Sequence, residues 1–448
     1  MSSLRNKLTY TQMIVLSFFL IILVGATILC LPISSRTKEW TPFLDAMFTA
    51  TSATCVTGLV IYDTFSHWSV FGQVVILILI QIGGLGVMTC IAMIALFLKR
   101  RISLGERRLL MQSAGSLEIS GIVKLILRIL KGTIVVEGCG AILLSIAFCP
   151  QMGFIRGVWN AVFHAVSAFC NAGFDIMGKY GKFSSLTGNG LAANPLVCLT
   201  ITALIIIGGI GFLVWGDIVK NKRDFSKYQV HSKIILVTTG ILVLSGAVLF
   251  FIFEYNHSLA GLSLGQKLLN SLFQSVTPRT AGFNAVDMST LSGSGTILTM
   301  LLMFIGGSPG STAGGIKTTT FVVLLLGALS SARRFGSITI FKRRLDEHTV
   351  IQASAVATIY ASIIIIAVMA ISAFEPFSIT EILFEAISAI GTVGLSMGIT
   401  PYLSSISEII LMLLMFAGRV GGLSLMLVLA ERRISVPIDR PTVKILIG

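Results

Sequence analysis

Charged side chains are scarce in this sequence. They make up 12% of its 448 residues, whereas about a quarter is usual in soluble globular domains. Hydrophobic residues make up 54%, and the mean hydropathy is +0.92. A soluble domain is therefore excluded, and several apolar runs are long enough to cross a membrane core, which takes about 20 residues. Examples are residues 10–32, 73–98 and 196–216.

The groupings that carry enzyme chemistry are also missing. The five histidines have no metal-ligand spacing, and no nucleophile, base and carboxylate occur as a set. The seven cysteines lie mostly inside apolar segments, where packing is their expected role. No glycine-rich fingerprint of a nucleotide-binding domain is present. We therefore expect no enzyme and no cofactor in this chain.

The net charge of +14 is explained by how the basic residues are distributed. Most of the 33 Lys and Arg residues fall in five clusters. These are the N-terminus, residues 99–131, 220–233 and 333–344, and the tail from Arg432. Because cytoplasmic loops of membrane proteins are rich in Lys and Arg, we expect these segments and both termini of a multi-pass membrane chain in the cytoplasm. No nucleic-acid partner is needed to explain the charge.

One motif occurs four times. Residues 45–63, 160–175, 270–287 and 381–396 each open with a polar residue three positions before a Phe and end in small residues around a Gly. An apolar run precedes each copy, and another run with a Gly-rich mark follows it. We predict an all-α membrane protein of four tandem repeats, each a span, a short pore helix with a loop, and a second span, in pseudo-fourfold arrangement around one pore. The predicted repeats are residues 11–98, 121–219, 230–330 (with a broken last helix) and 348–430, followed by a cytoplasmic tail, 431–448.

The short helices determine what the loops can do. We expect polar caps at their outer ends, at Asp45, Asn160, Asn270 and Thr380. Their C-terminal ends, where the macrodipole is negative, then point into the membrane and favour a cation. Glycines in the loops allow a backbone whose carbonyls face inward, as in potassium filters. The predicted filter residues are Val56, Thr57, Gly58, Asn171, Ala172, Gly173, Thr280, Ala281, Gly282, Thr392, Val393 and Gly394.

The sequence resembles the Trk/Ktr/HKT family of cation transporters over nearly its whole length. The resemblance rests on "CVTGL", "NAGFD", "TPRTAGFN", "GTVGLSMG" and "GGSPGSTAGGIKTTT". It implies potassium-selective uptake through the bacterial inner membrane by the ion-translocating subunit of a Ktr-type system. Gly58 would favour potassium over sodium at the filter carbonyls. It also implies a homodimer and a separate KtrA/KtrC-like cytoplasmic ring that binds ATP or ADP. That ring would dock on the basic loops around residues 99–108, 220–227 and 333–344.

A second feature lies in the third repeat. Residues 304–321 contain too many glycines, with Pro309, for a regular helix, so we expect a loop below the filter. A glycine-packed helix crossing is the alternative. The predicted gate residues are Gly306, Gly307, Ser308, Gly310, Ser311, Thr312, Gly314, Gly315, Lys317 and Arg419.

Three basic residues occur inside these motifs. Arg419 stands where the other repeats have Gly84, Gly209 and Gly307, and an intramembrane Arg is a functional candidate. Its guanidinium can bind loop carbonyls and oppose a cation. Lys317 either supports this barrier or lies at the cytoplasmic end and snorkels. We expect Arg279 to brace the third loop from behind, against a carboxylate of repeat two or four.

An alternating-access solute carrier or a sodium-coupled carrier is the alternative function, because carriers also use broken helices. Four repeats in the same direction favour an axial path instead.

Overall fold

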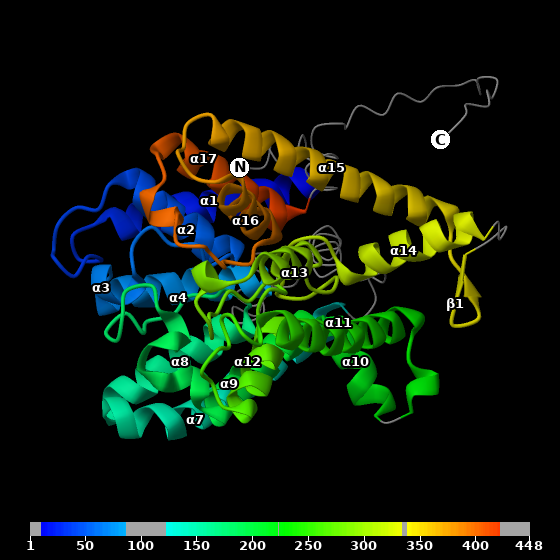
Figure 1. The fold of residues 1–448 in the computed structure, drawn as a ribbon, viewed down its shortest axis with the longest axis horizontal. Coiled ribbons are helices and arrows are strands. Elements are labelled where there is room, and N and C mark those ends of the chain that lie inside the picture. Colours follow the sequence, from blue (N-terminus) through cyan, green and yellow to red (C-terminus); the bar gives the residue numbers. More distant parts are fainter. Residues whose placement is uncertain (1–9, 87–121, 223, 334–337, 422–448) are drawn as a thin grey trace.

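The protein is almost entirely helical (Figure 1), which confirms the predicted all-α class. The computed structural model describes residues 10–86, 122–222, 224–333 and 338–421. The basic segment 99–108, the last residues of the first and fourth predicted repeats, and the tail 431–448 lie outside the described residues.

The described helices can be grouped by the sequence motifs that they carry. The part of the chain that carries the first two motifs forms α1 (Tyr10–Cys30), α2 (Phe43–Cys55), α3 (Thr64–His67), α4 (Val70–Leu85), α7 (Ile122–Met152), α8 (Phe154–Phe169), η1 (Ser185–Ala193), α9 (Pro195–Gly209), α10 (Phe212–Asn221) and η2 (Phe225–Lys227). The part that carries the last two forms α11 (Val230–Glu254), α12 (Leu264–Val276), η3 (Met288–Thr290), α13 (Gly293–Phe304), α14 (Thr318–Ala332), α15 (Glu347–Ser372), α16 (Ile379–Gly391), η4 (Thr400–Tyr402) and α17 (Ser405–Val420). A two-stranded antiparallel hairpin, β1 (Thr339–Ile340) and β2 (Arg343–Arg344), lies between α14 and α15.

Four of the described helices, α1, α7, α11 and α15, are long and apolar enough to cross a membrane by themselves. A fifth span results if α9 and α10, whose axes differ by 96°, count as one broken span. Because α4 and α17 end where the described residues end, eight full spans remain a prediction.

The second apolar helix is interrupted at its Gly-rich mark in the second and third repeats. Helix α9 ends at Gly209 and α10 begins at Phe212, while α13 ends at Phe304 and α14 begins at Thr318. Gly211, between α9 and α10, has a φ angle of 95°, a region that residues with a Cβ rarely adopt. A break was predicted in the third repeat alone, and the structure adds one in the second.

The short helices α2, α8, α12 and α16 correspond to the four motifs, but the predicted N-caps are wrong. The observed N-cap residues are Pro42, Gly153, Ser263 and Ser378. Ser263 and Ser378 each form a capping box with the Gln or Glu three positions later. The helices therefore start earlier than predicted and run for 13 to 16 residues.

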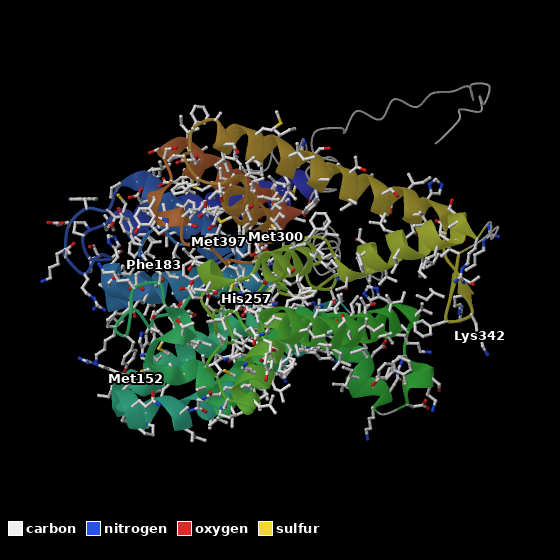
Figure 2. All side chains as sticks on the ribbon, in the orientation of Figure 1. Met152, Phe183, His257, Met300, Lys342 and Met397 are labelled. Carbon is white, nitrogen blue, oxygen red and sulfur yellow. The ribbon has the colours of Figure 1, made fainter. Side chains whose placement is uncertain are left out.

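The Phe of each motif anchors its short helix in the core. Phe48, Phe163, Phe273 and Phe384 are all essentially inaccessible to solvent. In Figure 1 the short helices lie among the long ones, with α12 against α11 and α2 against α1. The molecule has two distinct ends, marked in Figure 2 by Phe183 at one and by Lys342 of the hairpin at the other.

Candidate functional site

Each short helix ends at a residue that begins the loop of its motif. The residues that begin the four loops lie one to four positions after the helix ends and have positive φ angles. They are Val56, Asn171, Thr280 and Thr392, with φ of 57°, 58°, 72° and 51°. A positive φ is costly for a residue with a Cβ, and most of all for a β-branched one. The same left-handed turn in all four loops therefore indicates that the surrounding structure imposes it.

The four loops meet in a closed ring. The glycine ring comprises Gly58, Gly173, Gly282 and Gly394, which have φ angles of 99°, 69°, 76° and 89°. A Cβ added to Gly58 would lie 2.5 Å from the carbonyl oxygen of Ala172, and one on Gly173 would lie 2.8 Å from that of Ala281.

The other two members continue the same pattern. A Cβ on Gly282 would overlap the carbonyl oxygen of Val393, and one on Gly394 would overlap that of Thr57. Each repeat thus packs against the next, and the fourth closes on the first. The predicted filter residues are brought together as four equivalent loops, and only glycine fits at the third position of each.

A pocket of about 270 Å³ lies above the ring, at the end of the molecule marked by Phe183 (Figure 2). All four ring glycines line it. Asp63, Asp175 and Asp287 are also among its lining residues, together with Phe183. Carboxylates at the mouth of a narrow site raise the local concentration of cations.

Hydroxyl groups on or directly after the short helices hold the loops from behind, and none of them was among the predicted site residues. Ser52 Oγ accepts from Gly58 N at 3.0 Å, and Ser388 Oγ accepts from Gly394 N at 3.1 Å. The equivalent hydroxyls of the other repeats are Ser167 and Thr277, which donate at 2.7 Å to the carbonyls of Phe174 and Phe283. The available signal was a hydroxyl residue four positions after the motif Phe in every repeat.

Residues 305–317, the broken segment, form a loop between α13 and α14, as predicted. The alternative of a continuous glycine-packed helix is wrong. Ser308 N and Thr312 N donate to the carbonyls of Gly209 and Gly208, at 3.0 and 3.3 Å, where α9 ends. Thr312 Oγ1 donates to Phe169 O, the end of α8, at 3.1 Å.

The other side of the broken segment faces the fourth loop. A Cβ on Gly315 would lie 3.0 Å from Gly391 O, and one on Gly314 would overlap the side chain of Thr392. The broken segment therefore lies directly against the start of the second and fourth loops, on the side of the glycine ring opposite the pocket.

Arg419 connects this segment to the first repeat. Its guanidinium donates to the carbonyls of Thr312 and Gly83, and to that of Gly84 at 3.3 Å. Lys317 Nζ donates to Ala313 O and Gly314 O, at 2.7 and 3.3 Å, so its amine is held within the broken segment.

Arg279 differs from its prediction. Its recorded side-chain partner is the hydroxyl of Thr239 on α11, at 3.5 Å. Among the described residues, no carboxylate forms an ion pair with it. The brace is therefore within the third repeat.

Taken together, an all-helical membrane architecture and four short helices that aim their C-terminal ends at one loop ring define a class of membrane transport protein. The family model described as TrkH, a cation transport protein, matches residues 6–439. The chain is 42% identical to the potassium/sodium uptake protein NtpJ of Enterococcus hirae, over 93% of this chain and 92% of that protein. It is 41% identical to the Ktr system potassium uptake protein B of Bacillus subtilis, with the same coverage.

A solved structure has the same fold. The crystal structure of the potassium transporter TrkH from Vibrio parahaemolyticus aligns with a TM-score of 0.75 and 16% identity, over 94% of this chain and 85% of that one. The chain belongs to the TrkH family of cation transport proteins. The predicted family is confirmed, and so is the expectation that the protein is a transporter and not an enzyme.

Proposed function

We propose that this chain is the ion-translocating subunit of a Ktr-type potassium uptake system in the bacterial cell membrane. The observation that carries the proposal is the closed glycine ring. Each ring glycine packs against a backbone carbonyl of the next repeat, and this carbonyl belongs to the residue just before that repeat's own ring glycine. Backbone carbonyls in such a ring can replace the hydration shell of a potassium ion. The names of the relatives, which are potassium or potassium/sodium uptake proteins, support the same substrate.

The remaining filter residues act through their backbone. Val56, Asn171, Thr280 and Thr392 supply the turn, and Thr57, Ala172, Ala281 and Val393 supply the carbonyls. The negative ends of four helix dipoles favour a cation at this level. The membrane potential then drives the ion inward, with about 2.3 kcal/mol per charge per 100 mV.

The gate in this proposal is the broken segment together with Arg419. The segment's contacts with the second and fourth loops support a barrier below the ring. Arg419 fixes it by joining Thr312 to the end of α4, and its positive charge opposes a passing cation. Lys317 adds a second positive charge inside the segment.

Regulation comes from outside the chain in this proposal. A homodimer with one pore per protomer would carry a KtrA/KtrC-like ring that binds ATP or ADP, docked on the basic cytoplasmic loops. The hairpin contacts the α10–α11 connection, where the Phe341 and Phe225 rings are 6.5 Å apart, so two of these loops form one surface. N- and C-termini would lie on this cytoplasmic side.

The experiment is a flux assay on the purified chain in liposomes, with potassium, rubidium, sodium and lithium in turn, and with and without the nucleotide-binding ring. Potassium and rubidium flux well above sodium and lithium, raised by the ring, is the expected result. Equal flux of all four ions would refute the filter. The alternative, a sodium-coupled carrier, is favoured by the name of the Enterococcus hirae relative and predicts potassium flux that requires sodium.

A further inference from the structure

A second cavity lies beside the ion path and shares none of its lining residues. This lateral cleft has a volume of about 1080 Å³ and lies between the end of α1, the start of α4 and the start of α8. Apolar side chains on its lining are open to the surroundings: Ile33 is 61% exposed, Val70 64% and Ile155 83%. A cleft with such walls on a membrane protein faces lipid.

The lateral cleft is rimmed by cations. Arg36, Lys38, Arg156 and Lys179 line it, and no Asp or Glu does. Among the described residues, none of the four lies within 4.0 Å of a carboxylate. The Arg36 guanidinium lies over the Phe65 ring, 4.2 Å from its centroid. The ring attracts the guanidinium but has no net charge, so it does not neutralise it.

This concentration is unusual for its end of the molecule. Outside the five basic clusters and the motif residues Arg279, Lys317 and Arg419, the chain has six bases, which are Arg36, Lys38, Arg156, Lys179, Lys182 and Lys267. Four of these six line the lateral cleft. Non-cytoplasmic loops usually carry few Lys and Arg, so their gathering in one cleft indicates a bound anion.

A buried polar group in the cleft lacks a partner. Asn160 lines the cleft and is only 7% exposed, and its Nδ2 donates to Arg156 O at 2.9 Å. Its Oδ1 has no hydrogen-bond partner. Buried acceptors of this kind are normally satisfied, and a donor on a molecule bound in the cleft would satisfy Asn160 Oδ1.

We propose that the lateral cleft binds the headgroup of an anionic phospholipid with a hydroxyl donor, of which phosphatidylglycerol is the type. The four cations neutralise the phosphate, the headgroup hydroxyl donates to Asn160 Oδ1, and the acyl chains lie on Ile33, Val70 and Ile155. A second copy of this chain fits less well, because a symmetric contact here would bring eight like charges together.

Trp159 provides the test, because its side chain lines the cleft. The purified full-length chain in detergent is titrated with phosphatidylglycerol brominated on its acyl chains, and tryptophan fluorescence is recorded. Brominated phosphatidylcholine is the neutral comparison, and W159F identifies the part of the signal that comes from the cleft. We expect quenching of Trp159 at lower concentrations of phosphatidylglycerol than of phosphatidylcholine.

The charge variants form a matched set. R156Q and K179Q each lower the apparent affinity for phosphatidylglycerol about fivefold, the value of one basic residue near an anionic membrane surface. K182Q removes a charge from the same loop as Lys179 but outside the cleft lining, and keeps the affinity of the unmodified chain. A monodisperse elution profile shows that each variant is folded.

Three results would overturn the proposal. Equal quenching by the two lipids would show that lipid charge has no role in binding. Equal effects of K182Q and K179Q would show that any basic residue of this loop attracts the lipid, whether or not it lines the cleft. Absence of Trp159 quenching in a dimeric preparation would show that a second copy covers the cleft. Brominated phosphatidylmethanol, which is anionic but has no hydroxyl, should bind several-fold more weakly. Equal affinity would overturn the assignment of Asn160.

Discussion

Replacement of Gly58 by Ser tests the glycine ring most directly. The new Cβ would lie 2.5 Å from the carbonyl oxygen of Ala172, in a backbone with φ of 99°. The backbone strain costs about 1–3 kcal/mol. Relief of the overlap costs about another 1–3 kcal/mol, because neither the Cβ at position 58 nor the backbone oxygen of Ala172 can move without a shift of the main chain.

Gly261→Ser is the matched control. Gly261 has φ of 77°, but no atom lies within 4 Å of the position of its Cβ, so this variant has the strain without the overlap. If Gly58→Ser moves the Ala172 carbonyl outward, an energy of about 1–3 kcal/mol converts to a roughly 5- to 140-fold fall in the preference for potassium over sodium. Gly261→Ser should keep the preference and lose stability alone.

The assay is the ratio of potassium to sodium flux into liposomes, with thermal unfolding measured on the same preparations. The reasoning is refuted if Gly58→Ser and Gly261→Ser have the same flux ratio, because the overlap with the carbonyl would then have no effect on the ion.

Three further predictions follow from individual contacts. Arg419→Ala removes the link between the broken segment and α4, so basal flux should rise without the regulatory ring; lower flux at normal expression would contradict a barrier. Ser388→Ala leaves Gly394 N without its acceptor, which costs about 1–3 kcal/mol and should lower both thermal stability and ion selectivity, whereas unchanged selectivity would limit Ser388 to packing. Burial and the hydrogen bond to Asp45 raise the pKa of Tyr62 to about 12. Since the usual pKa of tyrosine is about 10, protonated Tyr62 stabilises the folded state fully below pH 10, and this contribution is lost as the pH rises to 12. The unfolding temperature of the unmodified chain should fall over this pH range, and that of Tyr62→Phe should fall less.

Much of the site could be predicted because its physical requirements are local. A glycine that follows a short amphipathic helix in all four repeats indicates a backbone position with positive φ. The structure has this conformation at Gly58, Gly173, Gly282 and Gly394. The broken segment was predictable for the same reason, since Pro309 and its neighbouring glycines are incompatible with a helix.

The parts that were wrong or missed depend on contacts across the chain. The predicted N-cap residues were wrong because a polar residue near a helix start can equally lie inside the helix. Asn160 does so in α8. The carboxylate expected beside Arg279 is replaced by Thr239, which sequence distance alone could not indicate. The break at Gly211 was missed because the runs on either side of it are apolar enough to read as one continuous helix.

The order of contacts around the ring has a consequence for biosynthesis. Gly394 of the last repeat packs against Thr57 of the first, so the wall between them is completed by the final quarter of the chain. A nascent chain with three finished repeats would expose the inner surface of its loops sideways to lipid. That open side would have to be shielded from lipid until translation ends.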